Sequence, residues 1–394
     1  MNNSLTYKYS NNQFIEFILI LILLSFPKID LINIPHHYQG IRIEDLIVVY
    51  IGISLYLSNS IEIHKQDFGY LFYIFFFVLV FSIVHGSIYF TQKWLIVPRY
   101  LEYIIILIYF NRSNPSLNTI FCISRTYLIL NLLFVVLQQN GLVGEFSSLG
   151  YEGTENKSDD RPTGLTGGPW ELSNCSAIIF FLLLLDKKQS NYSKYIYSFI
   201  AVFLMLATVS RTILVSFIVA LMLYFYIKHI NRRRYFIFLF LFIIFTTLLF
   251  LYIEKYFPAF GKVYYEIIPM FKNFIFYQET PDLSNLDNKL WSMAYRIDHW
   301  SAYYKQFLYN PTTIIFGSGS TTMYYESTIF RVLFGSGLFG LIFVIYSIRN
   351  IPLHILILFL VSGLSLDLLL SFKIFFTMLL YFYVHKKIKY DYRN

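Results

Sequence analysis

The sequence carries a loop in which an arginine precedes glycines and prolines and then an apolar run. Residues 161–170 read Arg161-Pro-Thr-Gly-Leu-Thr-Gly-Gly-Pro-Trp170. Pro169 suits the first turn of a following helix, and the N–H groups at a helix start near Arg161 suit a phosphate. Trp170 is typical of a membrane interface. An ordinary loop with an interfacial tryptophan explains the composition equally well.

Arg211 is the only charged residue between Lys194 and Lys228. One helix over this stretch would be about 50 Å long at about 1.5 Å per residue, whereas the hydrocarbon core of a bilayer is about 30 Å thick. We therefore predict two helices, with Ser210-Arg211-Thr212 at the turn between them. An arginine in so tight a turn favours a binding role, because its desolvation is costly. The alternative is a long cation that snorkels to the surface.

Residues 291–310 predict an amphipathic helix that Asn310-Pro311 ends. Its apolar side has helical spacing and consists of Met293, Ile297, Trp300, Tyr304 and Phe307. Arg296, His299 and Tyr303 are three and four residues apart, so they share one face. That face is either part of a site or the solvated side of a helix on the membrane surface.

A Gly/Ser segment, 317–320, precedes Glu326 at the mouth of the next apolar run, and Arg331 follows about one turn inside. Glu326 could act as a general base or as an acid that the helix dipole stabilises. The paired acids Glu44 and Asp45 could hold a metal, but no third ligand lies near them in the sequence. Lys373 is a polar group within or near a predicted span, and such groups often pair with other helices.

The elements that position these residues are membrane helices. The chain has 394 residues, of which 57% are hydrophobic and 14% charged, whereas soluble domains carry about 25% charged residues. Its two cysteines, Cys122 and Cys175, exclude a disulfide scaffold, a zinc ribbon and an iron–sulfur protein. The formal charge of +8 is spread between apolar runs. We interpret it as a topology signal and as attraction for an anionic ligand, not as a nucleic-acid surface.

We predict an all-α membrane protein with about twelve spans of about 17–25 residues each. They lie near 14–34, 43–58, 68–90, 94–110, 119–138, 171–186, 194–210, 212–228, 235–253, 327–347, 351–370 and 372–385. Residues 1–253 then hold spans 1–9 with the outer loop 139–170. Residues 254–326 form a long extracytoplasmic loop with amphipathic helices, and residues 327–394 hold spans 10–12 and a tail.

The short loops predict the orientation, because cytoplasmic loops are rich in Lys and Arg. The basic residues at 187–188, 194, 228, 232–234 and 386–393 all fall on one side when both termini are cytoplasmic. The first apolar run has no small-residue cleavage site after it, so we expect a retained span.

These motifs, in this order and on this side, resemble the O-antigen polymerase and O-antigen ligase family of bacterial envelope glycosyltransferases. The resemblance rests on the arginine-glycine loop, the Ser-Arg-Thr turn, Arg296-Ile-Asp-His-Trp300, Gly317-Ser-Gly319 and Glu326-Ser327 before a Gly-rich helix. Ile43-Glu44-Asp45-Leu46 is similar to the family's N-terminal pattern. The family implies a fold like that of metal-independent multi-span glycosyltransferases, without a cofactor. It also implies a donor oligosaccharide on undecaprenyl diphosphate and a reaction on the outer face of the bacterial plasma membrane, the inner membrane.

The resemblance also assigns roles. Arg161 and Arg211 match arginines near the lipid diphosphate, and Arg296 matches a loop arginine. The ligase branch has a histidine where this chain has Glu326, and no histidine lies between Trp300 and Arg331, which favours the polymerase branch.

In the implied reaction, a sugar hydroxyl attacks the anomeric carbon and the lipid diphosphate leaves. Glu326 or His299 could take the proton, with Arg296 in the same catalytic group. Arg331 would join Arg161 and Arg211 at the diphosphate, since arginines can replace a metal there. Trp300 and Tyr303 could stack on sugars.

Three alternatives stay open. The first is an O-antigen ligase that transfers glycan to lipid A core. The second is a lipid-linked oligosaccharide flippase, although the sequence shows no repeat of the kind that transporters often have. The third is a non-catalytic scaffold, for which so many outer arginines would be surplus. From the family we also expect a chain-length regulator protein as a partner. Nucleic acid is not expected.

Overall fold

The computed structural model describes fourteen stretches of the chain and shows them to be mostly helical. They are residues 11–32, 41–57, 96–147, 150–152, 161–228, 296–298, 300–301, 304–305, 311–317, 327–348, 351–364, 366, 368 and 371–391. The chain divides into two compact units. The first comprises Met1–Leu79, Trp94–Phe217 and Leu368–Asn394, and the second comprises Val80–Lys93 and Ile218–Asp367.

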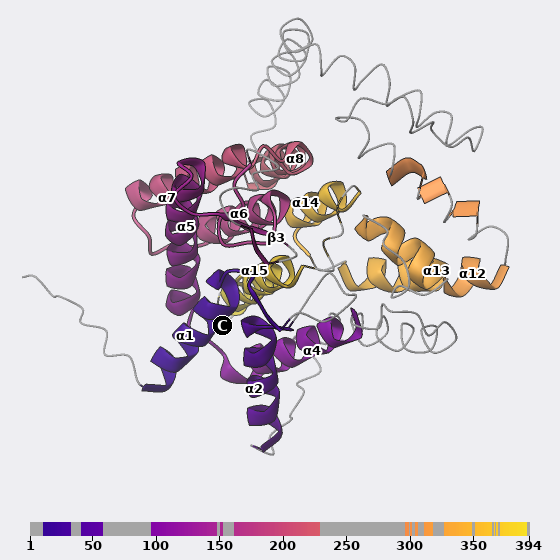
Figure 1. The fold of residues 1–394 in the computed structure, drawn as a ribbon, viewed down its shortest axis with the longest axis horizontal. Coiled ribbons are helices and arrows are strands. Elements are labelled where there is room, and N and C mark those ends of the chain that lie inside the picture. The colour runs from indigo at the N-terminus through magenta and orange to yellow at the C-terminus, as the bar shows by residue number, and fades with distance from the viewer. Residues whose placement is uncertain are drawn as a thin grey trace, which may run out of the picture. The chain divides into compact units, whose positions relative to one another are not determined.

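The described helices of the first unit form a bundle in which α6 packs against α5, α7 and α15, and α1, α2 and α4 pack against one another or against α5 and α15 (Figure 1). They are α1 (Asn11–Ser25), α2 (Ile43–Leu57), α4 (Ile96–Ser113), α5 (Leu117–Gln139), α6 (Pro169–Leu184), α7 (Asn191–Ala207), the start of α8 (Arg211–Lys228) and α15 (Phe372–Asp391). α6 contacts α5, α7 and α15, and its residues from Glu171 to Leu183 are buried. An apolar helix buried on all sides is expected at the centre of a membrane bundle.

Two short antiparallel pairs of strands lie at the ends of these helices. β1 (Asp30–Ile32) pairs with β2 (Ile41–Arg42), and β3 (Glu145–Ser147) pairs with β4 (Gly150–Glu152). The two pairs occupy the connection between α1 and α2 and the connection between α5 and α6. These are the connections that the sequence analysis places on the outer side.

Local chemistry sets several helix boundaries. Ser116 and Ser190 cap α5 and α7, with their hydroxyl oxygens accepting from the N–H groups of Thr119 and Ser193 at 3.1 and 3.3 Å. The predicted break into two helices is confirmed, because α7 ends at Ala207 and α8 starts at Arg211. The turn lies at residues 208–210, so the prediction that Arg211 and Thr212 are turn residues is wrong: both belong to α8. Between the two helices Val209 has a φ of 49°, the left-handed region that interrupts a helix.

Two predicted spans are longer than the helices that form. The span predicted at 14–34 is wrong beyond Ser25, where α1 ends. Pro27 disfavours helix in the residue before it, and the chain then enters β1. The span predicted at 351–370 is α14 (Leu353–Gly363). The carbonyl at Gly363 accepts from the Ser327 hydroxyl at 2.9 Å, so it is bound by the start of another helix.

The other predicted spans that the structure describes agree with its helices to within three residues at each end, except that α15 continues to Asp391, six residues past the span predicted at 372–385. The predicted spans at 68–90 and 235–253 lie outside the described residues. Among the described helices, α5 and α8 are long and apolar enough to cross a membrane, and α1, α6 and α14 supply shorter apolar stretches. The helices are therefore compatible with an all-α membrane protein, whereas the number of twelve spans stays a prediction.

The second unit contains α12 (Pro311–Phe316), α13 (Thr328–Ile348), α14 and the rest of α8. α13 is kinked at Gly337, whose φ is 66°. A Cβ there would lie 2.3 Å from the carbonyl oxygen of Ile315 and 2.6 Å from the backbone nitrogen of Gly317. Only glycine allows this close approach of two backbones, so the kink fixes the end of α12 against α13.

Candidate functional site

A buried group of charges connects the start of α6 with the segment that follows α1 and with the start of α15. The Lys28 Nζ lies 2.8 Å from Glu171 Oε1, and the Ser371 hydroxyl donates to the same oxygen. The other carboxylate oxygen of Glu171 accepts from the N–H of Gly167 at 2.7 Å. Glu171 is fully buried, so its charge needs these donors in place of water.

Lys373 completes this group and holds two segments of backbone. Its Nζ donates to the carbonyl oxygen of Phe26 at 2.6 Å and to that of Leu165. It also interacts electrostatically with Glu44 and Glu171. We refer to Lys28, Glu171, Ser371 and Lys373 together as the clamp.

The loop at 161–168 is also held from α5. The side-chain oxygen of Gln138 accepts from the N–H groups of Thr163 and Gly164 at 3.1 and 2.8 Å. The Asn131 oxygen accepts from the N–H of Leu165 at 2.9 Å. Since α5 and the clamp together bind most of its backbone, the loop is fixed with respect to the helices.

Two glycines make this arrangement possible. Gly164 has a φ of 58°, and a Cβ there would lie 2.5 Å from Oδ1 of Asn131. A Cβ on Gly167 would lie 2.4 Å from the side chain of Lys28. The glycines of the predicted phosphate loop thus admit the side chains that hold the loop.

A second charged network lies at the starts of α2 and α4. Arg99 Nη1 is 2.6 Å from Glu102, 3.2 Å from Asp45 and 3.9 Å from Glu44. Arg42 lies 3.8 Å from Glu44, and its N–H donates to Asp45 at 2.8 Å. The pair Glu44-Asp45 therefore has a third carboxylate beside it, Glu102, which the sequence analysis did not identify. An arginine lies among the three.

The two networks join at the helix ends that the sequence analysis places on the outer side. Glu44 interacts with Arg42 and Arg99 on one side and with Lys373 on the other. Lys373 in turn shares Glu171 with Lys28. The predicted topology places these helix ends together, and its orientation in the membrane stays a prediction. The joined networks hold the loop through Glu171, which accepts from the N–H of Gly167, and through Lys373, which donates to the carbonyl of Leu165.

Arg161 and Arg211, the two predicted diphosphate arginines of the first unit, are both exposed. Arg161 opens the loop that the clamp fixes, and Arg211 is the first residue of α8. The helix start that was expected to offer N–H groups to a phosphate instead carries Glu171, a carboxylate of the protein, in its first turn. This leaves the Arg161 side chain as the part of the loop suited to an anion.

The remaining predicted residues that the structure describes belong to the second unit. Arg296 is half-buried and Arg331, on α13, is buried. Trp300 is 3% exposed, and its ring lies 4.8 Å from that of Phe330. Trp300 therefore packs against α13 through Phe330. The described residues of the predicted helix at 291–310 are helical, whereas its His299 and Tyr303, and Glu326 beyond it, lie outside the described residues.

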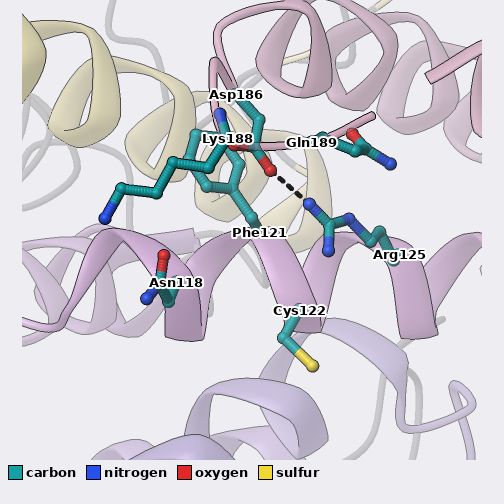
Figure 2. Close-up of a pocket in the computed structure, with 7 residues that line it drawn as sticks. All are labelled: Asn118, Phe121, Cys122, Arg125, Asp186, Lys188 and Gln189. Carbon is teal, nitrogen blue, oxygen red and sulfur yellow. Dashed lines mark hydrogen bonds and ion pairs between the residues drawn. The ribbon is translucent and has the colours of Figure 1, made fainter. Parts of the chain in front are cut away.

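The opposite helix ends form a separate pocket of about 280 Å³ between α5 and the α6–α7 connection. Figure 2 shows Arg125 of α5 pointing to Asp186, with which it forms an ion pair, while the Lys188 amine points away from this pair. The N–H of Lys188 donates to Asp186 at 3.0 Å. This pocket lies on the side that the sequence analysis assigns to the cytoplasm, away from Arg161.

Sequence reasoning missed Lys28 and Glu171. Both are charged residues within or beside apolar runs, and that placement alone marks a functional or pairing role. Lys373 was noted as a pairing residue, but its partners were not identified.

Comparison with family models matches residues 196–345 to the family described as O-antigen ligase. A comparison with curated proteins finds no match. The matched segment starts within α7 and ends within α13, so it includes Arg211, Arg296, Glu326 and Arg331. The match confirms the family resemblance and, with the apolar helices, supports a membrane protein that processes glycans.

Proposed function

From its relationship to the O-antigen ligase family over residues 196–345, we propose that the chain polymerises lipid-linked oligosaccharide repeat units. The reaction takes place on the outer face of the bacterial plasma membrane, and both termini are cytoplasmic. The donor and the acceptor are both carried on undecaprenyl diphosphate, and a separate protein regulates the length of the chains. The family match is the observation that carries this proposal.

In the proposed step, a hydroxyl oxygen of the acceptor sugar forms a bond to the anomeric carbon of the donor. The bond from that carbon to the diphosphate breaks, and the diphosphate takes the electron pair. Glu326 or His299 receives the hydroxyl proton, and Arg296 supports the reacting groups. Arg161, Arg211 and Arg331 offset the charge on the diphosphate, because a preorganised cation stabilises charge that develops in the transition state.

The fixed loop supports the part given to Arg161. The backbone that follows this arginine in the loop is held by the clamp, Gln138 and Asn131. A rigid mount reduces the entropy lost when an arginine binds its anion. Trp300 and Tyr303 are proposed to contact sugars, and for Trp300 this requires access to a ring that now packs on Phe330.

Polymerase is preferred to ligase because Glu326 stands where the ligase branch has a histidine. Ligase remains the second candidate, since it is the activity in the description of the matching family. The two differ in acceptor, which is another lipid-linked unit for a polymerase and lipid A core for a ligase.

Deletion of the gene followed by electrophoresis of the surface polysaccharide tests the proposal. If the lipid A core carries a single repeat unit and the ladder of bands from longer chains is lost, the result supports a polymerase. Core without any repeat unit, with long chains on the carrier lipid, identifies a ligase. Single units that accumulate on the inner leaflet identify a flippase.

Substitutions then test the assigned site. Arg161→Ala and Arg211→Ala should leave the protein in the membrane at normal abundance and abolish long chains. Lys194→Ala removes a cation on the opposite predicted side and should leave chain length unchanged. Normal chain lengths in both arginine variants would refute the diphosphate assignment.

A further inference from the structure

The first unit contains an open cleft of about 570 Å³ that the proposed reaction does not use. It lies between α1, the second half of α2 and the ends of α4 and α15. Its lining includes Glu16, Arg112, Ser113 and Lys387 at one end. These residues are at the helix ends opposite the clamp, on the side assigned to the cytoplasm.

Two cations from different helices line the cleft. Arg112 is exposed at the end of α4 and presents a guanidinium whose donors suit a phosphate. Lys387 is fixed, because its Nζ donates to Asn114 at 2.9 Å, to the carbonyl of Pro115 at 3.0 Å and to the hydroxyl of Tyr383 at 3.0 Å. These bonds hold a positive charge at the wall of the cleft.

One carboxylate, Glu16, lines the same cleft. Its Oε1 is buried, and within the described part of the chain it accepts no hydrogen bond. The hydroxyl of Ser113 and the amine of Lys387, both in the lining, lie near enough to interact with this carboxylate. A carboxylate accepts several hydrogen bonds, so Glu16 can take a further donor from a bound molecule.

The wall that α1 and α2 contribute is mostly apolar, with Ser54 as its polar exception beyond Glu16. Ile15 and Tyr50 are exposed, and Leu19, Ile51 and Leu55 continue the wall. In a membrane protein this open side meets lipid. The cleft therefore has a polar end with two cations and one carboxylate, and an apolar side for a hydrocarbon chain.

We propose that this cleft binds a phospholipid whose headgroup carries both a phosphate and a primary amine. The phosphate pairs with Arg112 and Lys387, the ammonium donates to Glu16, and an acyl chain lies along Leu19 and Ile51. The negative phosphate then lies next to the two cations of the lining, and the positive ammonium lies next to its carboxylate. This proposal requires a membrane protein but does not depend on the glycan reaction.

Native mass spectrometry of the purified, delipidated full chain in detergent tests it. The probes are phosphatidylethanolamine, phosphatidylcholine and phosphatidylglycerol with identical acyl chains. Phosphatidylcholine has a quaternary ammonium that cannot donate to Glu16, and phosphatidylglycerol has no cation. Since hydrogen bonds to charged groups are the stronger ones, phosphatidylethanolamine should bind about tenfold more tightly than phosphatidylcholine.

Three variants separate the parts of the headgroup. Glu16→Gln should bring the preference for phosphatidylethanolamine over phosphatidylcholine below about twofold. Arg112→Gln and Lys387→Gln should weaken all three lipids together. Lys389→Gln is the matched control, because Lys389 is exposed on the same helix and does not line the cleft.

Equal binding of the three lipids by the wild type would overturn the proposal. Tightest binding of phosphatidylglycerol would also overturn it and would identify a site for an anionic lipid. A Glu16→Gln variant that keeps the amine preference, or a Lys389→Gln variant that loses as much binding as Lys387→Gln, would likewise contradict the assignment.

Discussion

Glu171→Gln tests whether the clamp stabilises the fold. The amide keeps the size of the side chain and can still accept from Gly167, but it removes the only anion that Lys28 pairs with in the described structure. Lys28 is 10% exposed and Glu171 is fully buried. Loss of one partner of a buried pair costs about 3–5 kcal/mol, against about 0–1 kcal/mol for a surface pair.

We expect a loss of about 3 kcal/mol, at the lower end of the buried range, since Lys28 retains some access to water. Reversible unfolding of the purified protein by SDS in mixed micelles, followed through tryptophan fluorescence, measures it. Glu145→Gln, which changes a half-buried carboxylate in the β3 strand in the same way, is the control and should change stability by less than about 1 kcal/mol.

A double-mutant cycle isolates the pair itself. Lys28→Met should cost clearly less in the Glu171→Gln background than in the wild type, because the cation it removes is already without its anion. Strictly additive effects, together with a Glu171→Gln loss below about 1 kcal/mol, would refute the reasoning that these charges hold the loop.

Three further changes test other parts of the structure, by the same unfolding assay. Gly337→Ala should destabilise the protein by at least about 1–2 kcal/mol, because alanine is strained at a positive φ and its Cβ would meet backbone atoms. Gly52→Ala is the control and should be neutral or stabilising, because the nearest atom to its Cβ would be in the flexible side chain of Ile105, 3.3 Å away. Gln138→Leu should cost about 2–4 kcal/mol, since it leaves two loop N–H groups without an acceptor, and it should shorten polysaccharide chains in cells. Arg125→Ala should cost more than Arg125→Ala combined with Asp186→Asn, because the single change leaves a buried carboxylate without its cation. Equal stability of the two glycine variants, a stable Gln138→Leu protein or an undiminished loss in the double variant would contradict the respective argument.

The helices follow closely from the sequence because hydrophobic runs and charge positions are local signals. The scarcity of charge between Lys194 and Lys228 was enough to predict the break beside Arg211. The end of α1 was predicted too late, although Pro27 and Lys28 signal it, because apolar residues resume after them.

The clamp could not be predicted, because its members are distant in the chain. Glu171 binds Lys28 143 positions before it and Ser371 200 positions after it. The local sequence marks the charged members as pairing residues but does not show their partners, which only the packing of the helices brings together. The sequence shows that α13 is rich in glycine. It does not show which glycine is at the kink, because that depends on where α12 ends.

The partners of Glu171 have a consequence for biogenesis. The ribosome adds Lys28 and Glu171 to the chain long before Lys373. During synthesis the carbonyl of Leu165 therefore has no hydrogen bond from Lys373 until α15, the last described helix, enters the membrane. Chains shortened before α15 would therefore insert their earlier helices yet leave the arginine loop unfinished. The insertion of α15 thus determines when this loop is held, and quality-control proteases that sample loosely held loops would distinguish chains with α15 from chains that lack it.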